Sequence, residues 1–297
     1  MVHFTSNTYQ MKRQILSFSN KISRNLPKPE RKFIADMNYG ILASGRCLLT
    51  DIVDRLQEPS RKINIVDRLS RHLAKGIPKD ALKSYLTQVR KWCPDHPVIH
   101  IDDSDVVKPD GYKFESLGWV RDGSESTATK SVYKKGYHVT EATVLTNNNH
   151  PVSIFSEIHS SKEKGFTSIN DVTFSAMERA AALFERSTFV MDRGYDDNKM
   201  FQFENFRVRK LKAINALNFY LTLCMAFLGH ISMRSETNML KAAIIQTADP
   251  IKEKVTFCYY RLAKGISGIL SYAKEGIRLW FRTKRPAYRQ LCLKLAV

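Results

Sequence analysis

The stretch that decides the fold is "VIHIDDSDVVKP", residues 98–109. Its apolar, β-branched start predicts a buried strand over residues 98–102. Three acids follow within four positions: Asp102, Asp103 and Asp105. Because the whole chain carries a formal net charge of +18, this concentration of negative charge at the end of a buried strand requires an explanation.

Charge divides the 297-residue chain into three parts. Residues 1–95 hold 18 Lys/Arg and 8 Asp/Glu, residues 96–199 hold 12 and 16, and residues 200–297 hold 17 and 5. Two basic ends therefore flank an acidic centre. The basic ends favour a polyanion such as nucleic acid. The acidic centre is typical of an enzyme that holds metal ions over a phosphate backbone, and a protein that only binds DNA does not need it.

Cysteine usage and hydropathy indicate which cellular compartment the chain fits. The five cysteines are scattered and form no CxxC pair, which argues against a zinc site and a disulfide framework and fits a reducing, nucleoid-associated cytoplasmic location. The first residues contain no apolar signal core. The longest apolar run, residues 217–229, is too short and too interrupted for a membrane span, so we expect it to be the buried part of a helix.

Residues 1–95 are expected to form a helical, basic, DNA-binding domain. Apolar residues recur at helical spacing over 31–58, up to Pro59, and again over 63–76. Two helices around a Pro/Ser turn fit a helix-turn-helix reader of DNA. A plain helical bundle with a basic face fits the same pattern equally well.

Residues 96–200 predict an α/β core, because strand-like and helical patterns alternate there. The remaining residues, 201–297, are expected to form a basic helical region. The expected elements are a β-hairpin of 137–146 and 151–159, a helix at 168–187, a strand at 188–191 that leads into Asp192, and one long helix over 203–230.

The two apolar strands that end in acid suggest a metal site. In open α/β sheets, ligands lie outside the carboxyl ends of the strands, so neighbouring strands would bring Asp103 and Asp192 face to face. Two close carboxylates repel each other, and Mg²⁺ (or Mn²⁺) relieves that repulsion with hard oxygen ligands. A turn or cap role is the alternative for either acid alone. Lys108 and Arg193 stand beside the acids and are predicted to contact phosphate, with surface salt bridges as the alternative.

The chain resembles bacterial insertion-sequence transposases of the DDE type, in the family-four branch that carries a Y-R-E-K signature. The resemblance covers most of the chain and lies in the order of "SRNLPKPERKF", "IVDRLSRHL", "IHIDDSDVVKP", "FESLGWVRDGS", "KGYHVTEATVLT", "FVMDRGYDD" and "FENFRVRKLKAIN". It implies a ribonuclease-H-like core that cuts double-stranded DNA at transposon ends and joins the 3′-OH to target DNA, using Mg²⁺. Asp103 and Asp192 then take the places of the first and second catalytic, metal-binding acids. A homodimer is left open.

The third catalytic acid of that family has no counterpart in this sequence. The resemblance places it within a Y-x2-R-x3-E-x6-K pattern, and residues 193–297 do not contain that spacing. Glu204 follows Asp192 by only twelve residues and belongs to a stretch downstream of the family's catalytic Glu. Two alternatives follow: an active DNA transposase, or a catalytically defective remnant that only binds DNA. Both predict phosphate contacts at a basic cluster of Arg207, Arg209, Lys210 and Lys212.

Overall fold

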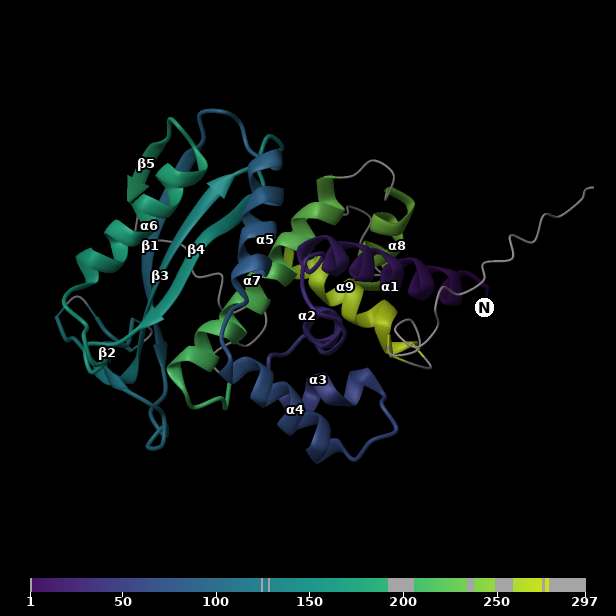
Figure 1. Cartoon of the computed structure of the whole chain (residues 1–297), viewed down its shortest axis with the longest axis horizontal. Coiled ribbons are helices and arrows are strands. Elements are labelled where there is room, and N and C mark those ends of the chain that lie inside the picture. The colour runs from purple at the N-terminus through teal and green to yellow at the C-terminus, as the bar shows by residue number, and fades with distance from the viewer. Residues whose placement is uncertain are drawn as a thin grey trace, which may run out of the picture.

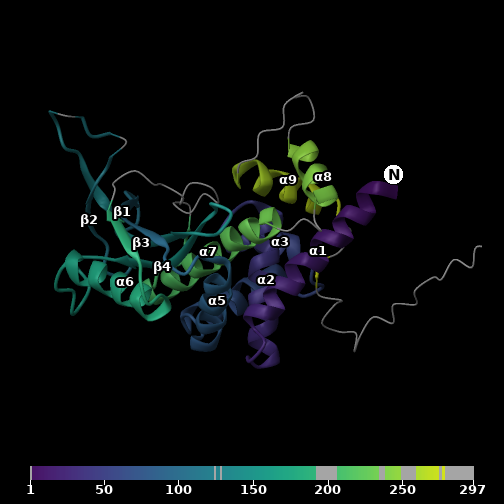
Figure 2. The same cartoon turned by 90° about the horizontal axis from the view of Figure 1, so that it is seen from above.

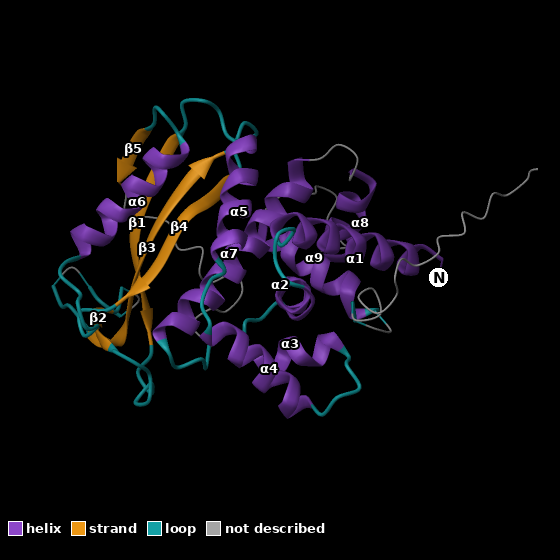
Figure 3. Ribbon diagram, viewed as in Figure 1, coloured by secondary structure: helices purple, strands orange, loops and turns teal. Residues whose placement is uncertain are grey.

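The computed structural model describes residues 2–123, 125–127, 129–191, 206–233, 238–248, 259–273 and 276–277. It confirms a mixed α/β fold, in which a sheet of five described strands lies beside a body of helices (Figures 1 and 3). The elements are α1 (Val2–Ile22), α2 (Lys28–Ser44), α3 (Leu49–Leu56), α4 (Lys62–Ala74), α5 (Lys79–Trp92), β1 (Val98–Val107), β2 (Gly118–Arg121), β3 (Tyr133–Leu145), β4 (Pro151–His159), α6 (Ile169–Leu183), β5 (Thr188–Met191), α7 (Leu211–Met233), α8 (Asn238–Ala248) and α9 (Tyr259–Ser271).

The single helix predicted over 31–58 is in fact two helices, α2 and α3. α2 ends at Gly45, whose φ of +67° lies in the left-handed region and whose N–H donates to the carbonyl of Ile41 at 2.8 Å. Glycine adopts this conformation without strain, so the helix stops there. α3 then folds back closely onto α2, because a Cβ added at Gly40 would lie 2.3 Å from Cγ2 of Ile52.

A partly buried ion cluster ties α4 to α2. Arg68 of α4 donates to Glu58 at 2.8 Å and to Asp36 of α2 at 3.0 Å, and Lys32 of α2 donates to the same two carboxylates. Burial raises the pKa of Asp36 to about 6, although both cations oppose the shift. For Glu58, burial also raises the pKa, but hydrogen bonds from Arg68 and Lys32 outweigh it and lower the pKa to about 2. The two carboxylates differ because Asp36 is the more deeply buried.

We expect Arg68→Ala to lower the free energy of unfolding by about 2–3 kcal/mol, somewhat less than loss of one partner from a fully buried ion pair, since Arg68 is partly exposed. The substitution leaves Asp36, which is 1% exposed, with Lys32 alone. Urea denaturation measures the change. The matched control is Lys62→Ala, which breaks the exposed pair with Asp54 and should cost less than about 1 kcal/mol. Equal losses in the two variants would contradict a stabilising role for the cluster.

β1 organises the sheet. It pairs antiparallel with β3 along most of its length and parallel with β5, where Ile101 lies opposite Met191. β3 pairs on its other edge with β2 and β4, so the predicted hairpin of β3 and β4 is confirmed. The strand predicted at 98–102 continues to Val107. Its acids therefore lie within β1 and not beyond its end, because each continues the pairing with β3, as Asp103 does with Thr140.

α6 and α7 lie on opposite faces of β4. Ser156 of β4 accepts a hydrogen bond from Asn218 of α7 at 2.6 Å, whereas Glu157 and His159 line a pocket together with residues of α6. Successive side chains of a strand point to opposite faces, so the two helices sandwich the sheet at β4. α6 begins at an N-cap, Ser168, whose hydroxyl accepts from the Asp171 N–H at 3.2 Å, which fits the helix predicted there.

α7 begins at Leu211 and not at residue 203 as predicted. The carboxylate of Glu115 accepts from the Leu211 N–H at 2.9 Å, which satisfies a donor that the first turn leaves unpaired. By length and composition alone α7 could cross a membrane, but 78% of its most apolar window is buried by other parts of the chain. The prediction that 217–229 forms the buried part of a helix is confirmed.

Helices from both ends of the chain pack together. α9 contacts α1 and α2, and α8 contacts α1 and α9 (Figure 2). The hydroxyl of Thr8 donates to the carbonyl of Ile269 at 3.0 Å, and that of Ser267 donates to the carbonyl of Ala43 at 2.9 Å. The two basic end regions therefore share one helical body in the described part of the chain.

Candidate functional site

Asp103 lies in the middle of β1, where the buried apolar residues on one face of the strand give way to exposed acids. Ile99 and Ile101, on the same face of β1, are buried, whereas Asp103 and Asp105 are exposed. The hydroxyl of Thr140 donates to Oδ1 of Asp103 at 2.5 Å. Among the described residues Oδ2 has no hydrogen-bond partner, so this oxygen is available to a ligand.

Two polar rows cross the sheet from β1 through β3 to β4. Asp105 pairs with His138 at 2.7 Å between Oδ1 and Nδ1, and the His138 ring stacks on His159 with 5.7 Å between centroids. In the second row, Oγ1 of Thr140 lies 2.5 Å from Asp103 and 2.9 Å from Nε2 of His159. Because the single proton of Thr140 goes to the carboxylate, Nε2 of His159 is the donor in the other bond.

His159 is neutral at physiological pH. It is 2% exposed, and burial, assisted by the neighbouring His138, lowers its pKa to about 4 against the opposing attraction of Asp103 and Asp105. With the proton on Nε2, Nδ1 carries a lone pair, and this buried atom has no hydrogen-bond partner among the described residues. The row therefore ends in an unused acceptor.

An acidic pocket of 220 Å³ adjoins this row, lined by Glu157, His159, Glu163, Phe166 and Asp171 among others. Burial raises the pKa of Glu157 and of Glu163, and the charge of Glu157 adds to the effect on Glu163. Sequence analysis missed this pocket. The alternation of Glu157 and His159 along β4 is the signal that places both on the face of Asp103.

The structure places the strand before Asp192 beside β1. β5 ends at Met191, opposite Ile101, and Asp103 lies two residues further along the neighbouring parallel strand. The two strands are therefore neighbours, which is the condition for Asp103 and Asp192 to face each other. Asp192 and Arg193 lie outside the described residues, so the facing of the two carboxylates and the phosphate contact of Arg193 stay predictions.

The predicted phosphate contact of Lys108 needs correction. Lys108 is 9% exposed, its Nζ donates to the carbonyl of Phe206 at 2.9 Å, and the ammonium lies 3.9 Å from the centroid of the Phe206 ring. The cause is the extra length of β1, which puts Lys108 on the same buried face as Val106. The Lys108 ammonium therefore holds the segment before α7 through Phe206, and it is not exposed at the surface.

The basic cluster of Arg207, Arg209, Lys210 and Lys212 is exposed, and its phosphate contacts stay a prediction. No ion pair to any described residue engages these four side chains. The stem of Lys212 lies over Gly76, where an added Cβ would be 2.5 Å from Cε. The cluster therefore lies where the sheet, α7 and the helical body meet, with its charges open to an anion.

The described residues contain only part of a magnesium site. No group of three or more His, Cys, Asp or Glu side chains that could hold a metal ion occurs among them. Of the two predicted ligands only Asp103 is described, and its Oδ2 is the kind of hard oxygen that Mg²⁺ prefers. A complete site needs further carboxylates from residues outside the described ranges.

A two-stranded ribbon of β2 and β3 carries exposed aromatic and basic side chains that sequence analysis missed. Trp119 lies opposite Lys135, whose Nζ is 4.4 Å from the centroid of the indole ring, and Arg121 lies opposite Tyr133. Trp119 is 56% and Tyr133 60% exposed. The ribbon stands at the end of the sheet far from the helical body (Figure 2). Exposed rings beside cations are typical of surfaces on which unpaired bases stack.

Comparison with known proteins adds no relative. No protein-family model matches the chain, and no match was found among curated proteins or solved structures. Any functional assignment therefore depends on the residues themselves and on the resemblance read from their order.

We expect stability to depend on pH through His159. Its pKa is about 4 in the folded chain and 6.5 in the unfolded one, so the unfolded state binds more protons between these values. The contribution of His159 to the free energy of unfolding should therefore fall as the pH drops from 6.5 to 4, by up to about 3 kcal/mol. The raised pKa of Asp36 acts in the opposite direction in both proteins, so the difference in free energy of unfolding between the wild type and His159→Phe, measured by urea unfolding at each pH, isolates this contribution. His96→Phe, at an exposed position, serves as control. An unchanged pH dependence in His159→Phe would rule out this residue as the source.

Proposed function

We propose that this protein is a DNA-binding protein built on the core of an insertion-sequence DDE transposase, with Asp103 as the first catalytic acid. The observation that carries the proposal is the exposed carboxylate of Asp103 in β1, directly beside the parallel strand whose chain continues into Asp192. Comparison with known proteins contributes nothing to it. The resemblance of the ordered segments supplies the reaction class.

The order of the strands supports a ribonuclease-H-like core. Such a core begins with three consecutive antiparallel strands, continues through a helix and returns with a fourth strand parallel to the first. Here β1 pairs with β3, β3 pairs with β4, α6 crosses over, and β5 pairs parallel with β1. The β2 strand is an addition on the edge of β3. A crossover helix between parallel strands is the usual connection in α/β sheets.

Charge and exposure support double-stranded DNA as the substrate. The basic cluster has no carboxylate partner in the described part of the chain and extends from the sheet towards α4. Phosphate contacts from such residues position DNA without reading its sequence. Bound DNA would then pass from the helical body towards the acidic end of β1, where the reaction is proposed to occur.

Asp103 and Asp192 would hold the magnesium. The chemistry that Mg²⁺ supplies in such a site is activation of the attacking oxygen and stabilisation of the leaving 3′ oxygen. The protein's own part is to fix the carboxylate: Thr140, 0% exposed, donates to Oδ1 and leaves Oδ2 for the metal. Thr140 is itself held by the buried His159.

A second candidate function, binding without cleavage, is favoured by one observation. The sequence lacks the pattern that would carry the third acid. Two carboxylates bind one Mg²⁺ adequately, but a second metal with a single shared ligand binds weakly. In that case the basic surface is what remains of the function.

The decisive experiment is Mg²⁺-dependent nicking of a supercoiled plasmid that carries the DNA flanking the gene on both sides. We expect wild-type protein to nick it and Asp103→Asn to lose roughly 100-fold or more of the nicking rate. Loss of a residue that only hydrogen-bonds to a metal ligand costs less, about 10- to 100-fold. The control is Asp110→Asn, an exposed acid outside the strand, which should retain the rate. Nicking unaffected by Asp103→Asn would refute the catalytic role, and tight binding without nicking by the wild type would establish the binding-only alternative.

The DNA-binding part of the proposal is tested by the salt dependence of the affinity for duplex DNA. The logarithm of the affinity for duplex DNA should fall steeply with the logarithm of salt concentration, and each phosphate contact contributes about 0.9 to the slope. Removing Arg207 and Arg209 together, as Ala, should reduce that slope by about 2. Fluorescence anisotropy measures both. A double variant with the wild-type slope would remove the basic cluster from the DNA interface.

A further inference from the structure

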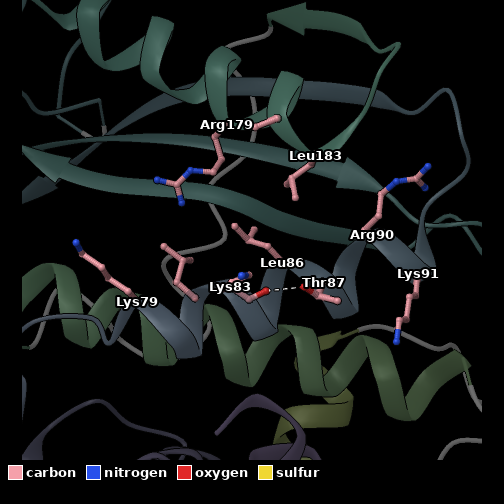
Figure 4. A pocket seen from close by; sticks show the side chains of 10 residues that line it. Lys79, Lys83, Leu86, Thr87, Arg90, Lys91, Arg179 and Leu183 are labelled. Atoms are coloured by element: carbon pink, nitrogen blue, oxygen red, sulfur yellow. Dashed lines mark hydrogen bonds between the residues drawn. The ribbon is translucent and has the colours of Figure 1, made fainter. Parts of the chain in front are cut away.

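A basic groove with an apolar floor lies between α5 and α6 (Figure 4). Its volume is 560 Å³. The residues that line it include cations and apolar side chains but no carboxylate: Lys79, Leu82, Lys83, Leu86, Thr87, Arg90, Lys91, Arg179, Ala182 and Leu183. The groove therefore offers two chemistries at once, positive charge along its rims and apolar surface beneath.

The helical repeat explains how these residues share one groove. On α5, Lys79, Leu82, Lys83, Leu86 and Arg90 stand at positions i, i+3, i+4, i+7 and i+11, so they lie on one face of the helix. On α6, Arg179, Ala182 and Leu183 stand at positions i, i+3 and i+4. From residue 79 to residue 91 this face is about 18 Å long, at 1.5 Å per residue.

The cations of the groove are largely unpaired. Lys79, Lys83, Lys91 and Arg179 form no ion pair with any described residue. Arg90 is the exception: it pairs at 2.9 Å with Asp95, an acid whose side chain is 86% exposed. Asp80 of α5, Glu178 of α6 and Glu185, which follows α6, are exposed and do not line the groove.

We propose that the groove between α5 and α6 binds an acidic amphipathic helix of a partner protein. Such a helix presents apolar anchors at three- and four-residue spacing, which match the floor of Leu82, Leu86 and Leu183. Its flanking carboxylates would pair with Lys79, Lys83 and Arg179 on the two rims. The inference does not depend on the proposed DNA function.

The lining of the groove favours a peptide over nucleic acid. Bases bind to single-strand surfaces by stacking on aromatic rings, and no aromatic side chain lines this groove. Contacts to a phosphate backbone need cations and polar groups, and three leucines would add nothing to them. The aromatic and basic ribbon of β2 and β3 has the character that this groove lacks.

The test is fluorescence anisotropy with the labelled peptide Ac-EELLEELLEELLEE-NH2, a version with every leucine replaced by serine, and a labelled duplex DNA. We expect the leucine peptide to bind, the serine peptide to bind at least about tenfold more weakly, and Lys79→Glu/Lys83→Glu to lose at least about tenfold in affinity for the leucine peptide. The matched control is Arg24→Glu/Lys28→Glu, which changes the net charge equally at exposed positions and should bind the peptide nearly as the wild type does.

Three results would overturn the proposal. The first is equal peptide affinity in the groove variant and the control variant. The second is equal affinity for the leucine and serine peptides, which would reduce the effect to net charge. The third is a loss of duplex DNA binding in Lys79→Glu/Lys83→Glu with peptide binding intact, which would make the groove a nucleic-acid surface.

Discussion

Burial of α7 is the constraint on which the rest of the structure depends. This apolar helix contacts β4 on one side and α2, α4 and α9 on the others, so it joins the sheet to the helical body. Its two asparagines make the union with the sheet specific: Asn218 binds Ser156, and the amide of Asn215 bonds both the N–H and the carbonyl of Ile158, at 2.8 and 2.9 Å. Apolar burial alone is not directional, so these hydrogen bonds fix the position of α7 along β4.

The same helix places the polar surface. Its first turn is held by Glu115, which lies in the connection between β1 and β2. The basic cluster immediately before and within that turn is thereby set at the junction of the sheet and α4. A core interaction and a surface feature thus share one element, because the basic cluster adjoins the first turn that Glu115 holds.

The sequence predicted the fold well wherever the signal was local. The hairpin of β3 and β4, the helix that starts near Ser168 and the strand before Asp192 follow from alternation and periodicity. The errors have tertiary causes. The break at Gly45 depends on the left-handed conformation of one residue, the start of α7 depends on Glu115 from nearly a hundred residues away, and the continuation of β1 through its acids depends on pairing with β3.

The site was less accessible to sequence analysis. Asp103 stood out because acid follows an apolar run, but its neighbours Thr140 and His159 are single residues in ordinary strands, and only the register brings them together. Lys108 was assigned to DNA because of its charge, and its burial depends on which face of an extended strand it occupies. The groove between α5 and α6 needs the relative position of two helices that are far apart along the chain.

The pairing of β1 with β5 has a consequence for how the protein folds. It joins residues 98–101 to residues 188–191, whereas the pairing of β3 with β4 closes over a short turn. Contacts between distant residues cost more loop-closure entropy and form late. The hairpin of β3 and β4 should therefore form before β5 joins β1, and the packing of α9 against α1 and α2, which spans a still larger separation, should follow. A chain halted after the hairpin would carry its acids on a β1 strand whose outer edge is still unpaired.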